Sequence, residues 1–206
     1  SDVYKRQVYS DLCLSRETAI RVVASSLEPN SVVVSTTGMI SRELFEYRES
    51  VGEGHTRDFL TVGSMGHASQ IALGIALQKK DRRIYCFDGD GALLMHMGSL
   101  AVIGSLHLNN YIHVVFNNGA HDSVGGQPTV GLQIELSSVA KACGYQGVFS
   151  VSDNHTLHEV LNLIKGIDGP IFLEIKVKKG ARKDLGRPTT SPVQNKDALM
   201  CFLNRN

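Results

Sequence analysis

The chain has 206 residues, of which 42% are hydrophobic and 20% charged, and its 21 basic and 20 acidic side chains leave a formal net charge of +1 at pH 7. A chain of this length can bury one sizeable hydrophobic core, so we expect a single domain over residues 1–206. The balanced charge argues against partners that are recognised through a global field, so we expect neither nucleic acid nor a membrane surface as a partner.

Cysteine usage and hydropathy favour a cytoplasmic location. Cys13, Cys86, Cys143 and Cys201 show no metal-ligand spacing, and we expect them to be free thiols in a reducing compartment. No apolar stretch reaches the roughly 18 residues that a membrane helix needs, and no signal peptide is evident. Residues 1–7 lack an initiator Met and resemble a translated adapter sequence, so we expect them to be non-native.

Helices and strands alternate along the chain. Residues 15–18 form a capping-box pattern that opens a helix ending near Leu27, and the β-branched residues 31–35 suit a buried strand. The elements expected after these are a helix at 40–47, a helix at 68–78 that follows residues 59–63, a strand at 83–87, a helix at 92–103, a strand at 111–116, a helix at 134–142, a strand at 147–151, a helix at 157–164 with caps at 152–154, and a strand at 170–177. This order predicts an α/β fold with a doubly wound, mostly parallel sheet and helices on both faces.

Two polar turns follow neighbouring predicted strands. Gly89-Asp90-Gly91 ends one strand, Asn117-Asn118 ends the next, and 25 residues separate the two motifs. Ligands of open parallel sheets lie beyond the carboxyl ends of the strands, so we expect both turns to face one crevice. The glycines and the helix start at Ala92 suit an anion, and Asp90 and Asn118 offer the oxygen ligands that Mg²⁺ prefers. The spacing therefore predicts a magnesium diphosphate site.

This pair of motifs resembles the metal-binding motif of the thiamine diphosphate enzymes. The resemblance implies that Asp90, Asn118 and the backbone carbonyl of Ala120 bind Mg²⁺, and that Gly89, Asp90, Gly91 and Ala92 contact the diphosphate. On its own, a Gly-Asp-Gly turn after a strand would be only a turn.

A second segment, Thr61-Val62-Gly63-Ser64-Met65-Gly66-His67-Ala68, resembles the stretch that cups the middle of the same cofactor. The resemblance implies that Met65 is the apolar wedge between the two rings and that the carbonyl of Gly63 accepts from the 4'-amino group of the pyrimidine. It also places Ser64 among the residues that bind the cofactor. Taken alone, the segment would equally suit a turn between a strand and a helix.

Three further strings, at 36–45, 118–129 and 180–188, closely resemble the phosphonopyruvate decarboxylases. This resemblance runs from about residue 30 to the end of the chain and covers only the C-terminal, diphosphate-binding half of those enzymes. It implies a lyase that uses thiamine diphosphate and Mg²⁺ to convert 3-phosphonopyruvate to phosphonoacetaldehyde and carbon dioxide, a step in 2-aminoethylphosphonate biosynthesis.

Basic residues and histidines supply candidates for contact with the substrate. A phosphonate needs cationic or amide donors, and Arg182, Lys183 and Arg187 lie in a glycine-bounded loop after the last predicted strand. The alternative for these three residues is a solvated basic loop. His121 follows the metal loop and is a candidate for proton transfer, as is His67 beside the predicted wedge; a structural role is the alternative for both.

The resemblance also implies a partner. Relatives supply the glutamate that activates the cofactor from a separate N-terminal pyrimidine-binding domain of a neighbouring subunit, and no glutamate here lies in a recognisable form of that motif. We therefore expect this domain to be missing from the chain, the isolated chain to bind the cofactor poorly and to turn over little, and the full-length enzyme to be a homo-oligomer. Two alternatives remain: the diphosphate-binding chain of sulfopyruvate decarboxylase or of another 2-keto acid decarboxylase, and a noncatalytic phosphate-binding domain.

Overall fold

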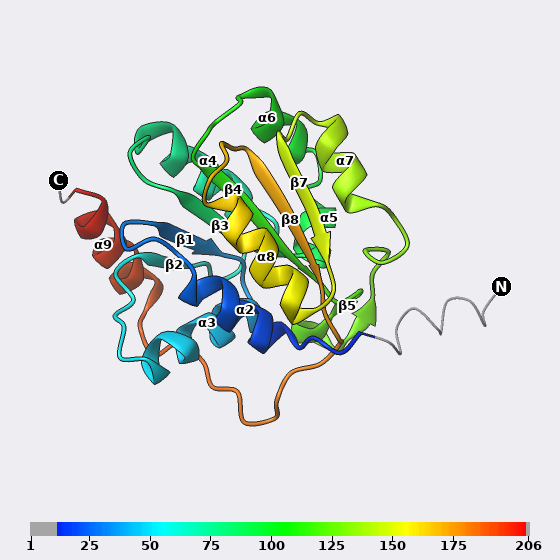
Figure 1. Cartoon of the computed structure of the whole chain (residues 1–206). Helices are drawn as coiled ribbons and strands as arrows, with labels where there is room; N and C mark the ends of the chain where they lie inside the picture. The colour runs from blue at the N-terminus through cyan, green and yellow to red at the C-terminus, as the bar shows by residue number, and fades with distance from the viewer. Residues whose placement is uncertain (1–11, 205–206) are drawn as a thin grey trace.

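Six parallel strands form the central sheet of the structure, a computed structural model that describes residues 12–204 (Figure 1). The predicted non-native segment 1–7 lies outside these residues. In the order β2-β1-β3-β4-β8-β7 the strands are Asp58–Leu60, Val32–Ser35, Ile84–Gly89, Tyr111–Asn117, Ile171–Lys176 and Gly147–Val151, and each neighbouring pair is parallel. The predicted doubly wound, parallel α/β fold is confirmed.

The helices lie in two layers, one on each face of this sheet. The face toward the viewer in Figure 1 is covered by α2 (Arg16–Ser25), α3 (Met39–Ser50) and α8 (Asn154–Ile164). The opposite core includes residues of α4 (Ala68–Gln78), α5 (Asp90–Met95), α6 (Ser99–Ser105), α7 (Leu136–Ala142) and α9 (Pro192–Leu203). A small antiparallel hairpin of β5 (Ala120–His121) and β6 (Gln127–Pro128) encloses the 3-10 turn η1 (Asp122–Val124).

Alternate residues of the central strands face the two layers. In β3, Tyr85 and Phe87 pack with α2, α3 and α8, whereas Ile84 and Cys86 pack into the opposite core. Because both faces of the sheet are covered, such strands appear in the sequence as continuous apolar runs. The expected buried thiol of Cys86 is confirmed, and Cys143 and Cys201 are also free.

The structure corrects the helix predicted at 92–103. The chain instead forms α5 and α6, with residues 96–98 between them, and the backbone N–H of Ser99 donates to the carbonyl of His96 at 2.9 Å. Glycine at position 98 disfavours a continuous helix because of its conformational entropy. The break lets Leu100 and Ile103 reach the core, where both are fully buried.

Several helix starts follow the predicted capping chemistry. The Ser15 hydroxyl accepts from the backbone N–H of Thr18 at 3.1 Å, and the Asp153 carboxylate accepts from that of Thr156 at 2.9 Å. Neither α9 nor the β5-β6 hairpin was predicted. Within residues 12–204, no helix combines the length and the apolar character required to span a bilayer.

The segment after β8 links distant parts of the carboxyl edge. Figure 1 shows it in orange, running from the end of β8 along the lower edge of the sheet to α9 beside β2. In α9, the Asn195 side chain accepts from the N–H of Leu60 at 2.8 Å and donates to the carbonyl of Asp58 at 2.8 Å. This residue therefore covers the outer edge of β2 and fixes the end of the loop that precedes α9.

Candidate functional site

The carboxyl ends of β1, β3 and β4 meet where the winding of the sheet changes direction. The chain passes from β1 to β2 on one side, while β3 lies on the other side of β1. Ligands of open parallel sheets bind at such a point. A cavity of about 40 Å³, the small cavity, opens here and is lined by Arg16, Thr36, Thr37, Met39, Ile40, Met65, Gly89, Asp90, Gly91, Ala92, Phe116, Asn118, Ala120, His121, Asp122 and Ser123.

Asp90 lies almost completely buried at the wall of the small cavity. Its Oδ2 accepts a short hydrogen bond from the Thr129 hydroxyl, and its Oδ1 accepts from the backbone N–H of Asn118 at 3.4 Å. Burial raises the pKa of the Asp90 carboxyl above its ordinary value, although these hydrogen bonds act in the opposite direction. A bound cation would favour the charged carboxylate, because it would supply the missing compensating charge.

The Asn118 amide is held from one side by Asp122. Asn118 Nδ2 donates to Asp122 Oδ2 at 2.7 Å, and Asn118 Oδ1 accepts from the N–H of Ala120 at 3.1 Å. The same oxygen of Asp122 accepts from Arg16 Nη1 at 2.8 Å and from the N–H of Gly180 at 3.0 Å. Arg16 is itself buried and forms a two-bond ion pair with Glu43, so the loop after β4 is tied to α2, α3 and the segment after β8.

Asn117 has a different role from Asn118. Its Nδ2 donates to the carbonyl of Gly131 at 2.8 Å and to Glu174 Oε1 at 2.7 Å, while its Oδ1 accepts from the N–H of Gly119 at 3.2 Å. Both ends of this buried amide are thus used inside the protein. Asn117 shapes the turn, and Asn118 is the member of the pair that lines the small cavity.

Thr36 contributes a buried hydroxyl to the small cavity. Its Oγ1 has no hydrogen-bond partner among the described residues, although the residue is only 3% exposed. A buried hydroxyl without a partner is costly, and such groups in folded proteins need an explanation. A ligand oxygen in the small cavity would provide the missing partner.

The turn between β2 and α4 has an unusual backbone. Gly63, Ser64 and Gly66 have φ values of 73°, 46° and 88°, and for Ser64 this left-handed conformation is uncommon. A Cβ atom at Gly66 would lie 2.4 Å from His96 Nδ1, so the turn packs closely on the end of α5. Met65 lines the small cavity and also a neighbouring one of about 490 Å³, the large cavity.

The two candidate histidines lie in different places. A Cβ atom at Gly91 would lie 2.4 Å from His121 Cε1, so the half-buried His121 ring rests against the Gly-Asp-Gly turn and lines the small cavity. His67 is exposed, its ring contacts that of His96 at 4.2 Å, and it lines neither cavity. The geometry therefore brings His121, and not His67, to the predicted metal ligands.

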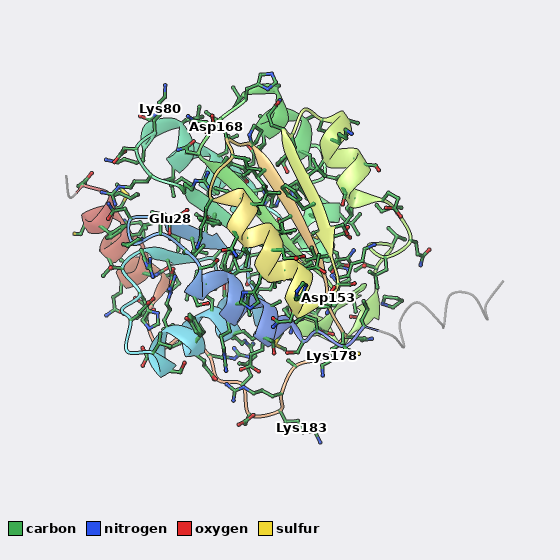
Figure 2. The ribbon with its side chains drawn as sticks, in the orientation of Figure 1. Glu28, Lys80, Asp153, Asp168, Lys178 and Lys183 are labelled. Carbon is green, nitrogen blue, oxygen red and sulfur yellow. The ribbon has the colours of Figure 1, made fainter. Side chains whose placement is uncertain are left out.

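The three predicted substrate cations do not converge. Arg187 lines the large cavity beside Gly63, Ser64 and Met65. Arg182 lines a separate cavity near Arg16 and is ion-paired with Glu17, Glu46 and Asp184. Lys183 is exposed at the tip of the loop, and Figure 2 shows its side chain pointing away from the ribbon.

The set of groups in the small cavity suits a divalent cation and an anion next to it. A carboxylate and a side-chain amide, with the backbone of Ala120 beside them, are the hard oxygen donors that Mg²⁺ takes, usually together with phosphate oxygens and water. The small cavity has room for a cation and water rather than for a whole cofactor. A larger ligand would extend into the large cavity, which shares Thr37, Met65 and Ser123 with it.

Another polar cluster lies away from both cavities, between β3 and β4. Cys86, Asp88 and His113 are fully buried, and their potential ligand atoms lie within 4.8 Å of one another. His113 Nδ1 lies 3.2 Å from the Tyr145 hydroxyl and Nε2 lies 3.4 Å from Asp88 Oδ2. Both ring nitrogens are therefore paired within the core, as expected for a structural histidine.

Several residues of the site were not predicted from the sequence. Asp122 and Thr129 belong to the string at 118–129, but their bonds to Asn118 and Asp90 were not anticipated. Thr36 belongs to the string at 36–45, and its buried hydroxyl appears only once the fold is known. Arg16 lies 106 residues from Asp122 in the sequence and gave no local indication of its role.

The chain is similar in sequence to known proteins. Residues 36–175 match the protein family described as "Thiamine pyrophosphate enzyme, C-terminal TPP binding domain". A phosphonopyruvate decarboxylase from Streptomyces viridochromogenes is 37% identical over 180 residues, which are 87% of this chain and 44% of the relative. The chain thus spans less than half of the length of that relative.

A shorter relative is matched over most of its length. The sulfopyruvate decarboxylase subunit beta from Methanothermobacter thermautotrophicus is 35% identical over 169 residues, which are 82% of this chain and 85% of the relative. Among solved structures, benzoylformate decarboxylase from Polynucleobacter necessarius superposes with a TM-score of 0.71 at 16% identity, covering 84% of this chain and 35% of the other. That structural likeness supports the fold alone.

Proposed function

Because the chain belongs to the thiamine pyrophosphate enzymes, as a C-terminal TPP-binding domain, we propose that it binds thiamine diphosphate together with Mg²⁺. We also propose that it serves in the decarboxylation of 3-phosphonopyruvate. The product would be phosphonoacetaldehyde. One observation carries the proposal: Asp90, Asn118 and the unpartnered hydroxyl of Thr36 meet around one cavity at the carboxyl edge of the sheet. An oxygen-lined, buried and partly unsatisfied site of this kind suits a metal diphosphate.

The residues of the chain would divide the work of binding. Asp90, Asn118 and the carbonyl of Ala120 would hold Mg²⁺, while Gly89, Gly91 and Ala92 let the backbone approach the diphosphate. Thiamine diphosphate, when bound, supplies the nucleophilic carbon and accepts the electrons released as carbon dioxide leaves. Met65 lines both cavities, and with Ser64 and the Gly63 carbonyl it would orient the rings. His121 would move a proton near the metal loop.

A second domain would complete the site. The large cavity is bordered by Val62 and Val124, whose exposed fractions are 73% and 65%. Exposed apolar side chains beside a proposed active site favour a covering partner. We propose that a pyrimidine-binding domain, carried by a second chain or by another part of the same enzyme, covers this edge and supplies the activating carboxylate. The complete enzyme would be an oligomer, as is common for soluble enzymes.

Calorimetric titration of thiamine diphosphate tests the binding proposal. The wild-type chain, without its partner domain, should bind the cofactor weakly with Mg²⁺ present and lose that binding in EDTA. Asp90→Ala should lose the metal-dependent binding. Asp184→Ala is the matched control. It removes an exposed carboxylate in the segment after β8, and this variant should bind the cofactor like wild type. Equal affinity of Asp90→Ala and wild type would contradict the proposed metal site.

Sulfopyruvate is a second candidate substrate. One observation favours it, since the chain covers 85% of a sulfopyruvate decarboxylase subunit beta and could correspond to a separate subunit. Both substrates should be offered to the chain after a pyrimidine-binding subunit has been supplied, and carbon dioxide release should be measured for each. The isolated chain should release little from either; full turnover without the second domain would refute the proposed incompleteness.

A noncatalytic phosphate-binding domain remains the third possibility, and the titration also tests it. Such a domain would retain diphosphate binding in EDTA and in Asp90→Ala. The proposed function predicts the opposite in both cases, because the cation and Asp90 would act together on the diphosphate.

A further inference from the structure

The large cavity is positively charged. Its wall contains the guanidinium-bearing residues Arg42 and Arg187 and no aspartate or glutamate. Hydroxyl-bearing residues make up much of the remaining polar wall: Thr37, Ser41, Thr61, Ser64, Ser123 and Thr190. Two of these hydroxyls already donate within the protein, Ser41 to the carbonyl of Thr36 and Thr61 to that of Ser35. A cavity with cations and without carboxylates favours an anionic ligand over a neutral or cationic one.

The two arginines differ from most other arginines of the chain in having no acidic partner. Within residues 12–204, no carboxylate lies within ion-pair distance of Arg42 or Arg187. The other half-buried or buried arginines are all ion-paired: Arg16, Arg48, Arg57, Arg82 and Arg83. Arg182, in the same loop as Arg187, is also ion-paired.

The two unpaired guanidinium groups come from distant parts of the chain. Arg42 lies in the first turns of α3, after β1, while Arg187 lies in the segment that crosses the carboxyl edge toward α9 (Figure 1). Folding therefore brings two cations to one cavity, which is unfavourable unless solvent or an anion compensates their charge. Arg42 is half-buried, so solvent compensates its charge only in part, whereas Arg187 is exposed and solvent screens its charge.

We propose that Arg42 and Arg187 bind the tetrahedral oxyanion of the substrate, the phosphonate or sulfonate at the end of the 2-keto acid remote from its reacting carbon. The inference rests on the proposed function, because it takes the small cavity as the metal diphosphate site. The shared residues Thr37, Met65 and Ser123 place the large cavity next to that site. Guanidinium groups bind such oxygens through paired hydrogen bonds, which a lysine cannot reproduce.

This assignment revises the predicted substrate site. Arg187 is retained, Arg42 is added, and Arg182 and Lys183 are left outside it, since neither lines the large cavity. Arg42 would make the enzyme select substrates that carry an anionic group at the end remote from the reacting carbon. A 2-keto acid with an uncharged alkyl group at that end would leave both guanidinium groups without an anionic partner. A site that hydrogen-bonds one particular substrate group discriminates against analogues that lack this group.

Binding of small anions to the full chain tests the inference. Methylphosphonate and methanesulfonate serve as probes, in the presence of thiamine diphosphate and Mg²⁺, and their dissociation constants are measured by calorimetry or by ligand NMR. Arg42→Gln and Arg187→Gln should each weaken binding of the better probe about tenfold or more. Arg42→Lys should fall between wild type and Arg42→Gln. The relative affinity of the two probes indicates which oxyanion the cavity suits.

Arg182→Gln is the matched control, because it removes an arginine of the same loop that does not line the large cavity, and it should leave the dissociation constants unchanged. Thermal unfolding of each variant verifies that it is folded, and Arg42→Lys provides the test at that position if Arg42→Gln does not fold. The inference is overturned if wild type binds neither probe, or if Arg182→Gln weakens binding while Arg42→Gln and Arg187→Gln do not.

The titrations separate this inference from the proposed function. If thiamine diphosphate binds as predicted but the arginine variants bind the probes like wild type, the proposed function stands and the inference fails. If the chain does not bind thiamine diphosphate, the proposed function fails, and the assignment of a substrate group to the two arginines fails with it.

Discussion

The amide of Asn118 donates from Nδ2 to Asp122 Oδ2 at 2.7 Å. This hydrogen bond fixes the orientation of the amide, so that its oxygen points away from Asp122. That oxygen accepts from the N–H of Ala120 at 3.1 Å, beside the proposed metal site. Asp122 in turn is held by Arg16 and by the N–H of Gly180. Groups that orient metal ligands in this way are known to matter for affinity almost as much as the ligands do.

Asp122→Ala should therefore weaken Mg²⁺ binding by about 10- to 100-fold at saturating thiamine diphosphate. Asp122→Asn should restore part of the loss, because its amide oxygen can still accept from Asn118 Nδ2. The measurement is a Mg²⁺ titration followed calorimetrically, with thermal unfolding in EDTA as the check on stability. If both variants lose stability but keep the wild-type Mg²⁺ affinity, Asp122 has only a structural role.

Thr36→Val should change stability and cofactor binding in opposite directions. The Thr36 hydroxyl is buried without a partner among the described residues, so its removal should leave the free energy of unfolding unchanged or raise it. The same change should weaken binding of thiamine diphosphate with Mg²⁺ about tenfold, since a hydrogen bond to a charged group contributes about 1.5–3 kcal/mol. Urea unfolding and calorimetric titration measure the two effects. Wild-type cofactor affinity in Thr36→Val would show that the hydroxyl does not face the ligand.

Much of the fold was predictable because its strands are short apolar runs that end in polar turns. The strand at 83–87 and the turn after it could be recognised locally, since both faces of β3 are buried. The break between α5 and α6 was not recognised, although Gly98, a poor helix former, lies directly before α6. For α9, Ser191 and Gln194 form a complete capping box, so the sequence did contain the information.

The site was predictable only where its residues are close in sequence. The spacing of Asp90 and Asn118 was sufficient to place both at one crevice, because adjacent parallel strands end at the same edge. The contact of Arg16 with Asp122, and the presence of Arg42 and Arg187 in the wall of one cavity, depend on the tertiary structure. On the sequence alone, Arg182 and Arg187 are equivalent; the structure distinguishes them by the ion pairs of Arg182 and by the different cavities that the two residues line.

Gly131→Ala should impair the metal site by displacing Asp90. A Cβ atom at position 131 would lie 2.6 Å from Asp90 Oδ2 and 2.8 Å from Asn117 Oδ1, both in buried side chains. Overpacking of this kind typically costs about 1–3 kcal/mol, and we expect at least a tenfold loss in Mg²⁺-dependent binding of thiamine diphosphate. Gly74→Ala is the control: it lies within α4 with open space around it, and it should stabilise the protein by about 0.5–1 kcal/mol. Equal cofactor affinity of the two variants would contradict the prediction.

Asn195→Ala should destabilise the protein through the edge of the sheet. The Asn195 side chain is 4% exposed and pairs with both the N–H of Leu60 and the carbonyl of Asp58, so alanine would leave two backbone groups of β2 without partners. A lost partner of a buried group costs about 1–3 kcal/mol, which should appear as a lower urea midpoint at an unchanged slope. Lys196→Ala, an exposed neighbour on the same helix, should stay within about 0.5 kcal/mol of wild type. If the two variants unfold at the same urea concentration, the contact of α9 with β2 does not stabilise the fold. In that case the contact also does not fix the end of the loop that carries Arg187.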